Sequence, residues 1–163
     1  MTTGGFNSKE LLALEDELTL SVLTNKEAVE IGECVIKIAR EKNLPIATRV
    51  YIGDWIAFHA SLPGSDAEND RWMSRKVRTV AAKGHSSMCL RILAEEAGIA
   101  EKDWYLQNNL AESDHAIHGG AFPLRVNGVH VGAVVVSGIP QEDDHRLAVA
   151  GLREFLARAD KND

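Results

Sequence analysis

The segment AFPLRVNGVHVGAVVVS constrains the fold of this chain more than any other. Asn127-Gly128 separates two apolar runs within it, and an Asn-Gly pair in that setting is a strong hairpin signal because a type I′ turn needs a positive φ at both of its central residues. The segment therefore predicts an antiparallel hairpin in which residues 121–126 pair with residues 129–136.

Strict alternation predicts how the side chains of this hairpin are distributed. Arg125 and His130 become cross-strand neighbours on one face. The apolar side chains gather on the other face, and they are Phe122, Leu124, Val126, Val129, Val131, Ala133 and Val135. The hairpin would thus supply one apolar wall.

Two helices and a second hairpin precede this segment. Apolar spacing predicts a helix over 8–22 behind Ser8 as its N-cap. It predicts another over 24–43, where Thr24 and Glu27 have the spacing of a capping box. A further hairpin turns at Gly53-Asp54, and its two mostly apolar faces favour a central place in the sheet. The cross-strand pairs expected there are Ile52 with Trp55 and Val50 with Ala57.

Two more helices complete the expected element order. A long helix would begin from a cap at Asn69 or Asp70, bend at Gly84 and end at Gly98. A last helix would start at Pro140, a residue favoured in the first turn. The order α-α-β-β-α-β-β-α, with hairpins in place of crossovers, predicts an α+β fold with an antiparallel sheet and helices packed on it.

The length and the overall charge limit the classes of protein to consider. A chain of 163 residues fits a single domain spanning 1–163, in which we expect a flexible start at 1–7 and a frayed tail at 157–163. A net charge of −6 and a pI near 5.5 argue against a nucleic-acid partner, because non-specific nucleic-acid binding uses a basic surface.

The chain shows no sign of export or of a membrane partner. No apolar run approaches the length of a membrane span, and the first residues lack the features of a signal peptide. Cys34 and Cys89 each lie within an apolar helical pattern, so we expect two buried thiols. A cytoplasmic location is the resulting expectation.

A basic stripe on the long predicted helix is one candidate for a binding site. At helical spacing Arg71, Arg75, Arg78 and His85 share one face, opposite an apolar one. Guanidinium groups bind carboxylates and phosphates in a bidentate fork, so the stripe could hold a small anion. It could equally be a solvated face, or one that pairs with acidic residues of a neighbouring subunit.

His118 is the second candidate, because a titratable side chain precedes Gly119-Gly120 where a buried strand should begin. Glycine there lets a ligand or another backbone approach closely, although His118 could simply bond a loop carbonyl. We expect His118 to share a concave site with the basic stripe. His145 opens the last helix on its buried face, in a capping, core or ligand role. No metal site is predicted, because His115 and His118 could bind a metal together only on a helix and the glycines argue against one.

Three stretches resemble a known family: NDRWMSRKVRTVAAKGHSSM, HGGAFPLRVNGVHVGAVVVSG and PQEDDH. In order and spacing, over about residues 45–155, they resemble the GlcG-like, or haem-degrading-domain, family, in its branch of short stand-alone cytosolic proteins of uncharacterised function. The resemblance implies a profilin-like fold, with an antiparallel sheet of about five strands and flanking helices, and ring-like homo-oligomers. Some relatives bind haem or are linked to cobalamin and glycolate metabolism. The positions that fit the pattern are His118, Gly119, Gly120, Arg75, Arg78, His85 and His145.

The sequence leads to one preferred function and two alternatives. The preferred one is a homo-oligomeric protein that binds haem or another small anionic molecule, with an imidazole for iron, arginines for the propionates and the hairpin as an apolar wall. The first alternative is an enzyme that uses a histidine of the same site as a general acid–base. The second is an interaction protein in which the same residues form a subunit contact and hold no ligand.

Overall fold

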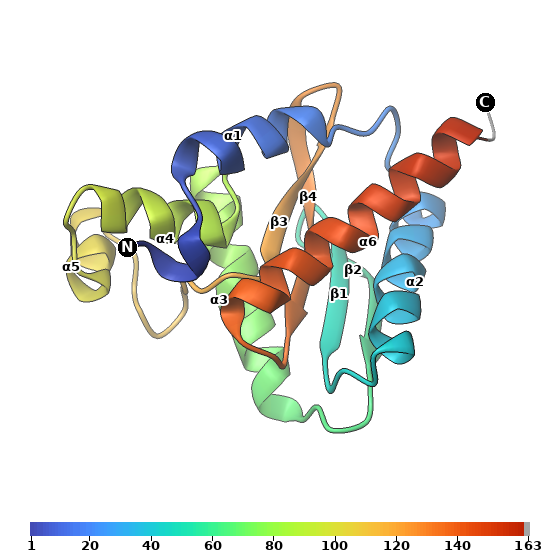
Figure 1. The fold of residues 1–163 in the computed structure, drawn as a ribbon, viewed down its shortest axis with the longest axis horizontal. Helices are drawn as coiled ribbons and strands as arrows, with labels where there is room; N and C mark the ends of the chain where they lie inside the picture. Colours follow the sequence, from blue (N-terminus) through green and yellow to red (C-terminus); the bar gives the residue numbers. More distant parts are fainter. Residues whose placement is uncertain (162–163) are drawn as a thin grey trace.

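The computed structural model describes residues 1–161. Its helices are the 3-10 turn η1 (Thr3–Gly5), α1 (Ser8–Glu17), α2 (Asn25–Glu41), α3 (Ala67–Lys83), α4 (Ser87–Glu96), α5 (Glu101–Gln107) and α6 (Gln141–Lys161). Its strands are β1 (Ala47–Ile52), β2 (Trp55–Ser61), β3 (Ala121–Val126) and β4 (Val129–Ser137). Figure 1 shows α1, α4 and α5 gathered at one end of the molecule.

The strands form one antiparallel sheet in the order β2-β1-β4-β3. Both predicted hairpins are present, and the α+β class is confirmed. The sheet has four strands within the described residues, so the expectation of about five was wrong. Beyond β3 the chain contributes only an isolated bridge, in which Leu20 meets Val126. One bridge covers the end of the β3 edge without forming a strand.

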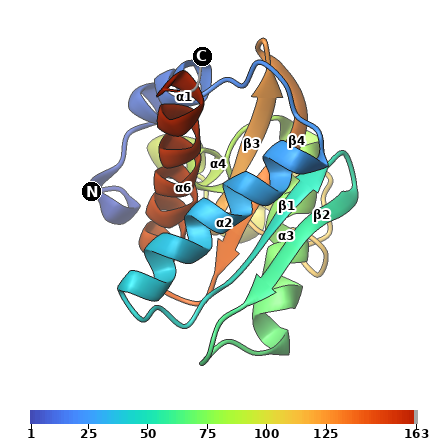
Figure 2. The same ribbon diagram turned by 90° about the vertical axis from the view of Figure 1, so that its right-hand side faces the viewer.

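Helices cover the two faces of the sheet unequally. Figure 2 shows α2 and α6 side by side on one face and α3 on the other. The α2–α6 side holds the larger core, in which Phe122 and Val134 from the sheet pack with Ile31 and Leu152 from the helices. The smaller core under α3 consists of Ala47, Tyr51, Met73, Val77, Val80, Ala121, Ala133 and Val135.

The alternation expected along the second hairpin was wrong, because the register shifts once. Arg125 does pair with His130, as predicted, but a bulge between Leu124 and Arg125 makes Phe122 pair with Val134. A shift of one residue sends every later side chain to the opposite face. The apolar set therefore divides: Phe122 and Leu124 face the larger core, Ala133 and Val135 face the smaller one, and Val129 at the tip is exposed.

The first hairpin has a bulge of the same kind. Ile52 pairs with Trp55 as expected, but Val50 pairs with Phe58 and not with Ala57. Only β1 takes the central place predicted for this hairpin. The other strand, β2, is an edge strand, and Trp55 lies largely exposed on it.

The predicted long helix is two helices. Gly84 adopts a φ of +76° and ends α3, because its N–H bonds the carbonyl of Val80 in a left-handed cap. Ser86 then caps α4 by accepting a hydrogen bond from Cys89. The N-cap of α3 is Asp66, whereas we expected Asn69 or Asp70; Asn69 instead completes the capping box.

The remaining helix ends follow the sequence signals only in part. The Thr24–Glu27 capping box of α2 is present, while α1 is capped by Asn7 in place of Ser8 and ends at Glu17. The early segment predicted to be flexible contains η1, where Thr3 donates to the Glu95 carboxylate. The predicted tail begins inside α6, which continues to Lys161, and its last residues, 162–163, lie outside the described part.

Two further expectations concern burial and membranes. Cys34 and Cys89 are both buried and free, as predicted, and burial raises the pKa of the Cys89 thiol to about 12. None of the helices in residues 1–161 is long and apolar enough to cross a bilayer.

Candidate functional site

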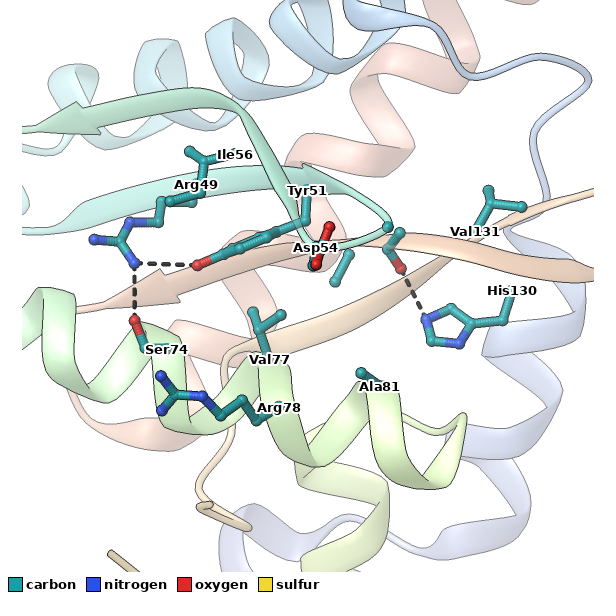
Figure 3. Close-up of a pocket in the computed structure, with 13 residues that line it drawn as sticks. Arg49, Tyr51, Asp54, Ile56, Ser74, Val77, Arg78, Ala81, His130 and Val131 are labelled. Atoms are coloured by element: carbon teal, nitrogen blue, oxygen red, sulfur yellow. Dashed lines mark hydrogen bonds between the residues drawn. The ribbon is translucent and has the colours of Figure 1, made fainter. Parts of the chain in front are cut away.

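A cleft of about 610 Å³ lies between α3 and the part of the sheet that α3 leaves uncovered (Figure 3). We call it the α3–sheet cleft. Its volume falls in the range of small-molecule and cofactor sites. Its lining residues are Arg49, Tyr51, Gly53, Asp54, Ile56, Ser74, Val77, Arg78, Ala81, His130, Val131, Gly132 and Ala133.

Small residues keep this cleft open along its length. Ala81 on α3, together with Gly132 and Ala133 on β4, brings little bulk into the space. Gly132 also has a structural reason to be glycine, since a Cβ there would lie 2.1 Å from the Tyr51 carbonyl oxygen across the β1–β4 pair. The absence of that side chain lets the strands pair and leaves the cleft wall flat.

Arg49 places a fixed positive charge at one end of the cleft. Its Nε donates to His59 Nδ1 at 3.0 Å, and one terminal nitrogen donates to the Tyr51 hydroxyl at 3.1 Å and to Ser74 Oγ at 3.0 Å. Asp70 lies 3.6 Å from the other terminal nitrogen. Figure 3 shows the bonds from Arg49 to Tyr51 and to Ser74, the second of which joins β1 to α3. The guanidinium is therefore held rigidly at the cleft wall.

His130 lies toward the other end and carries a different chemistry. Its Nε2 lies 3.0 Å from the Gly132 carbonyl oxygen, so Nε2 holds the proton of a neutral ring. Burial lowers the pKa of His130, and the charge of Arg125 adds to this effect against the opposing Gly132 hydrogen bond. The ring is thus neutral near pH 7, with an unprotonated Nδ1. A nitrogen of this kind can bind a metal or accept a hydrogen bond.

A second hollow, of about 570 Å³, continues from the cleft along α3 and shares Arg49, Ser74 and Arg78 with it. Arg75 donates to the Glu112 carbonyl oxygen at 2.8 Å and Arg78 to that of Asp114 at 3.4 Å. Both acceptors are neutral carbonyl groups, so they do not neutralise the positive charges of Arg75 and Arg78. The Arg75 Nε is buried and has no partner within residues 1–161. Glu68 and Asp70 also line this hollow, so an anion is favoured beside Arg75 and Arg78 rather than along its whole length.

His118 lies at a smaller cavity of about 230 Å³, which we call the His118 pocket. Its ring contacts the Trp72 ring, with 4.8 Å between centroids, and the Arg75 guanidinium lies 4.4 Å from the Trp72 centroid. Trp72 therefore links His118 to the basic stripe. The pocket is lined by Asn69, Trp72, Lys76, His118, Ser137, Gly138, Ile139, Gln141 and Asp144.

The glycines after His118 accommodate the protein's own backbone. A Cβ on Gly119 would lie 2.5 Å from the Gln141 carbonyl oxygen, and one on Gly120 would lie 2.4 Å from that of Val136. Gly120 also has a φ of +137°, which other residues rarely adopt. The sequence allowed either a ligand or another backbone segment to approach these glycines closely. The structure shows another backbone segment there.

The other two histidines predicted as site residues, His85 and His145, lie away from His118. His85 follows α3 and bonds Glu15 of α1, with 3.2 Å between Nδ1 and Oε2. His145 is buried in the core, where it contacts Phe6 and Phe122. Within one chain the structure thus does not gather His118, Arg75, Arg78 and His85 into one cavity, and a site shared across a subunit interface stays a prediction. Arg78 lies at the cleft, Arg75 at the adjoining hollow, and His85 at neither.

Comparison with known proteins places this architecture in a family. Residues 23–153 match the family described as haem degrading protein HbpS-like. The chain belongs to this family. The membership confirms the resemblance to GlcG-like, haem-degrading-domain proteins that the three sequence stretches indicated.

No group of three or more His, Cys, Asp or Glu side chains suited to a metal ion occurs in residues 1–161.

Individual relatives extend this HbpS-like assignment over most of the chain. A UPF0303 protein of Streptomyces avermitilis is 39% identical over 150 residues, which span 91% of this chain and 90% of the relative. The crystal structure of the Ybr137w protein matches with a TM-score of 0.84 at 25% identity, covering 95% of this chain and 90% of the other. A PduOC–haem complex matches with a TM-score of 0.68 at 15% identity, covering 81% and 94%, and shows the fold alone.

Sequence reasoning missed several residues of the two cavities in this HbpS-like chain. Arg49 and His130 each occupy a polar position within an apolar strand, and that mismatch was the available signal. Lys76 was not predicted as a site residue, because it lies on the apolar face of α3, opposite the basic stripe. Only 2% of Lys76 is exposed. A lysine among Met73, Val77 and Val80 could have indicated a buried ion pair.

Proposed function

We propose that this chain binds a planar, partly apolar molecule with anionic groups, and that it does so in the α3–sheet cleft. One observation carries the proposal: a single cleft joins an apolar wall to rigid arginines at one end and a neutral imidazole at the other (Figure 3). Haem is one ligand that fits such a cleft, because it combines an apolar ring, carboxylates and a metal.

The shape and charge of the cleft support this class of ligand. Tyr51, Val77 and Val131 offer apolar surface on both the sheet and the helix. Arg78 has only a neutral carbonyl as its hydrogen-bond acceptor, so a carboxylate would gain a charge-assisted bond there. A neutral sugar would gain little from either feature.

The residues of the cleft fit haem as one member of the class. His130 would offer its Nδ1 to the iron, and Arg49 and Arg78 would face the propionates. Bound haem would supply an iron centre for ligand or electron chemistry. The choice of haem as a probe is also supported by the family description and by the haem complex among the proteins of similar fold.

A titration with haemin and with iron-free protoporphyrin IX tests the proposal. We expect saturable binding of one molecule per chain for both porphyrins, with a Soret shift for haemin. H130L should weaken the binding of haemin more than the binding of protoporphyrin, because only the iron of haemin would bind the imidazole. R78M should lower the affinity for both porphyrins by about tenfold or more, since a hydrogen bond to a charged group contributes about 1.5–3 kcal/mol.

Two further variants separate cleft binding from surface adsorption. Ala81 is exposed and lines the cleft, so A81F should fill the space without disturbing the core and should abolish binding of both porphyrins. R40M removes an arginine from α2, outside the cleft, and should bind like the wild type. Non-saturable binding, or equal binding by A81F and the wild type, would overturn the proposal.

A further inference from the structure

The His118 pocket contains a second set of chemically matched groups, separate from the α3–sheet cleft. Its mouth carries the His118 ring beside Trp72, and its floor carries a buried ion pair between Lys76 and Asp144. Lys76 comes from α3, His118 from the segment before β3 and Asp144 from α6. Three distant parts of the chain thus bring a base and a cation to one cavity.

Glu101 fixes the His118 ring from outside the pocket. The two residues meet through His118 Nε2 and Glu101 Oε2 at 3.1 Å, and Glu101 also accepts from Tyr105 at 2.8 Å and from Arg91. Burial raises the pKa of Glu101, but the hydrogen bonds from His118 and Tyr105 and the charge of Arg91 outweigh it and lower the pKa to about 2. Glu101 is therefore a carboxylate that holds the Nε2 proton of His118.

This contact leaves the second ring nitrogen of His118 as a base. A neutral imidazole that donates through Nε2 has its lone pair on Nδ1. About a third of the side chain is exposed, at 31%, so the ring is accessible from the mouth of the pocket. A histidine oriented by a carboxylate on one nitrogen and open on the other is the usual arrangement of a general base.

Lys76 supplies a positive charge inside the same cavity. Its Nζ donates to Asp144 Oδ2 and to the Val136 carbonyl oxygen, both at 3.0 Å. An ammonium group has three N–H donors, so one remains beyond these contacts for a ligand oxygen. Only 3% of the Lys76 side chain is exposed, so a ligand oxygen would meet this third donor away from water, beside the paired carboxylate of Asp144.

We propose that the His118 pocket binds a small carbonyl compound and removes a proton from the carbon next to its carbonyl group. His118 Nδ1 takes the proton, and the electron pair of the broken C–H bond forms the C=C bond of an enolate. The carbonyl oxygen takes up the negative charge and is stabilised by Lys76. Return of the proton from His118 to carbon restores the carbonyl compound, so no oxidant or other reactant is needed.

The size and polarity of the pocket define this substrate class. A cavity of about 230 Å³ is smaller than the usual range for drug-sized ligands, so it suits a molecule of only a few carbons. Ser137, Asn69 and Gln141 add hydroxyl and amide groups at the wall for a second oxygen of the ligand. Glu101 is a positioning residue, because it acts through His118.

Exchange of substrate C–H for deuterium tests the proposal without knowledge of the full reaction. The intact chain is incubated in D₂O with dihydroxyacetone or with pyruvate, and loss of the proton signal next to the carbonyl is followed by NMR. We expect the wild type to exchange at least one probe faster than buffer does. H118Q should reduce this acceleration by about a hundredfold, because general-base catalysis typically contributes that much or more.

Matched variants separate chemistry from folding. The H118Q amide can still donate to Glu101 but lacks a basic nitrogen. His115 is a half-buried histidine outside the pocket, and its ring bonds the Ala111 carbonyl, so the H115Q protein should catalyse exchange like the wild type. The double variant K76M/D144N removes both charges of the ion pair together, and it should no longer accelerate the exchange of the substrate C–H. All variants are checked by thermal melting.

Glu101 needs a readout of its own. E101Q keeps an oxygen that can accept from His118, so it should retain more exchange activity than E101A at equal thermal stability. No acceleration of either probe by the wild type, or equal acceleration by H118Q, would overturn the proposal. Porphyrin binding in the α3–sheet cleft is independent of either outcome.

Discussion

His145 lies in the first turn of α6, and its imidazole is buried between Phe6 and Phe122. Its Nδ1 has no hydrogen-bond partner within residues 1–161. Burial lowers the pKa of His145 to about 4, with a smaller contribution from the charge of Arg146. A histidine in this position is a core side chain that must stay neutral, and this explains why it can pack among aromatic rings.

The first prediction follows from this pKa. The folded-state value lies below the ordinary 6.5, so the stability that neutral His145 contributes is complete above pH 6.5 and is lost as the pH falls toward 4. Between about pH 7 and about pH 5 the loss amounts to roughly 2 kcal/mol. Urea unfolding at the two pH values should show this loss in the wild type and a smaller one in H145L. Equal losses in the two proteins would contradict the assignment.

The second prediction concerns Gly120. G120A places a methyl group against the Val136 carbonyl oxygen at a φ that alanine rarely adopts, so it should destabilise the fold by about 2 kcal/mol or more. Gly128 also has a positive φ, but nothing lies within 4 Å of its would-be Cβ. G128A should therefore cost only about 1 kcal/mol by denaturant unfolding. A G120A protein as stable as G128A would show that Gly120 has room for a side chain.

At the scale of elements, the two hairpin turns and the capping box of α2 were predicted correctly, whereas the N-caps of α1 and α3 and the strand register were not. Asn127-Gly128 and the Thr24–Glu27 box act on adjacent residues, so their chemistry is readable along the chain. The two bulges depend on packing across the sheet, and no local residue pattern announces them. Because the bulge after Leu124 reverses the faces, the sequence could not show that Ala133 lines a cleft under α3 while Phe122 lies in the opposite core.

The candidate site shows the same division. The arginine stripe of α3 was predictable, since helical spacing fixes which residues share a face. The partners of Arg75 and Arg78 were not predictable, because they are carbonyl groups of the segment 111–115 after α5. His118 was recognised as unusual, but its neighbours Glu101, Lys76 and Asp144 come from three other elements. Spacing along the chain holds no information on such contacts.

The third prediction concerns how α3 holds that segment. Arg75 and Arg78 bond the carbonyl groups of Glu112 and Asp114, and Thr79 Oγ1 accepts from the Ala116 amide at 2.8 Å. The double variant R75A/R78A should therefore loosen residues 111–115 and speed their amide hydrogen exchange, while β1 and β4 keep wild-type protection. R71A, whose arginine pairs with Glu68 on its own helix, is the control. Unchanged exchange in the double variant would show that the two arginines do not anchor the segment.

At the scale of the whole molecule, one end of the sheet exposes apolar surface. Trp55 is 55% exposed, Ile56 42% and Val129 64%, and the Gly53 amide bonds Val131, which brings the two hairpin tips together. The strand β2 is also an open sheet edge. Open edges and grouped apolar side chains favour association, so we propose that the chain forms a homo-oligomer through this end.

The fourth prediction follows from that proposal. Light scattering at micromolar concentration should give a multiple of 17.8 kDa for the wild type. W55K/I56K adds charges to the exposed end and should lower the mass, whereas V22K, at an exposed apolar residue elsewhere, should not. A wild-type mass near 17.8 kDa would contradict the proposal.

The central claim is that the α3–sheet cleft is the porphyrin-binding site. Its most direct test is an amide NMR map of the chain with haemin, because the paramagnetic iron broadens signals from nearby protons. We expect selective broadening at Ala81 on α3 and at Val131 and Gly132 on β4, with signals of α2 and α6 unaffected. Broadening centred on Trp72 and His118, or spread evenly over the surface, would contradict the claim.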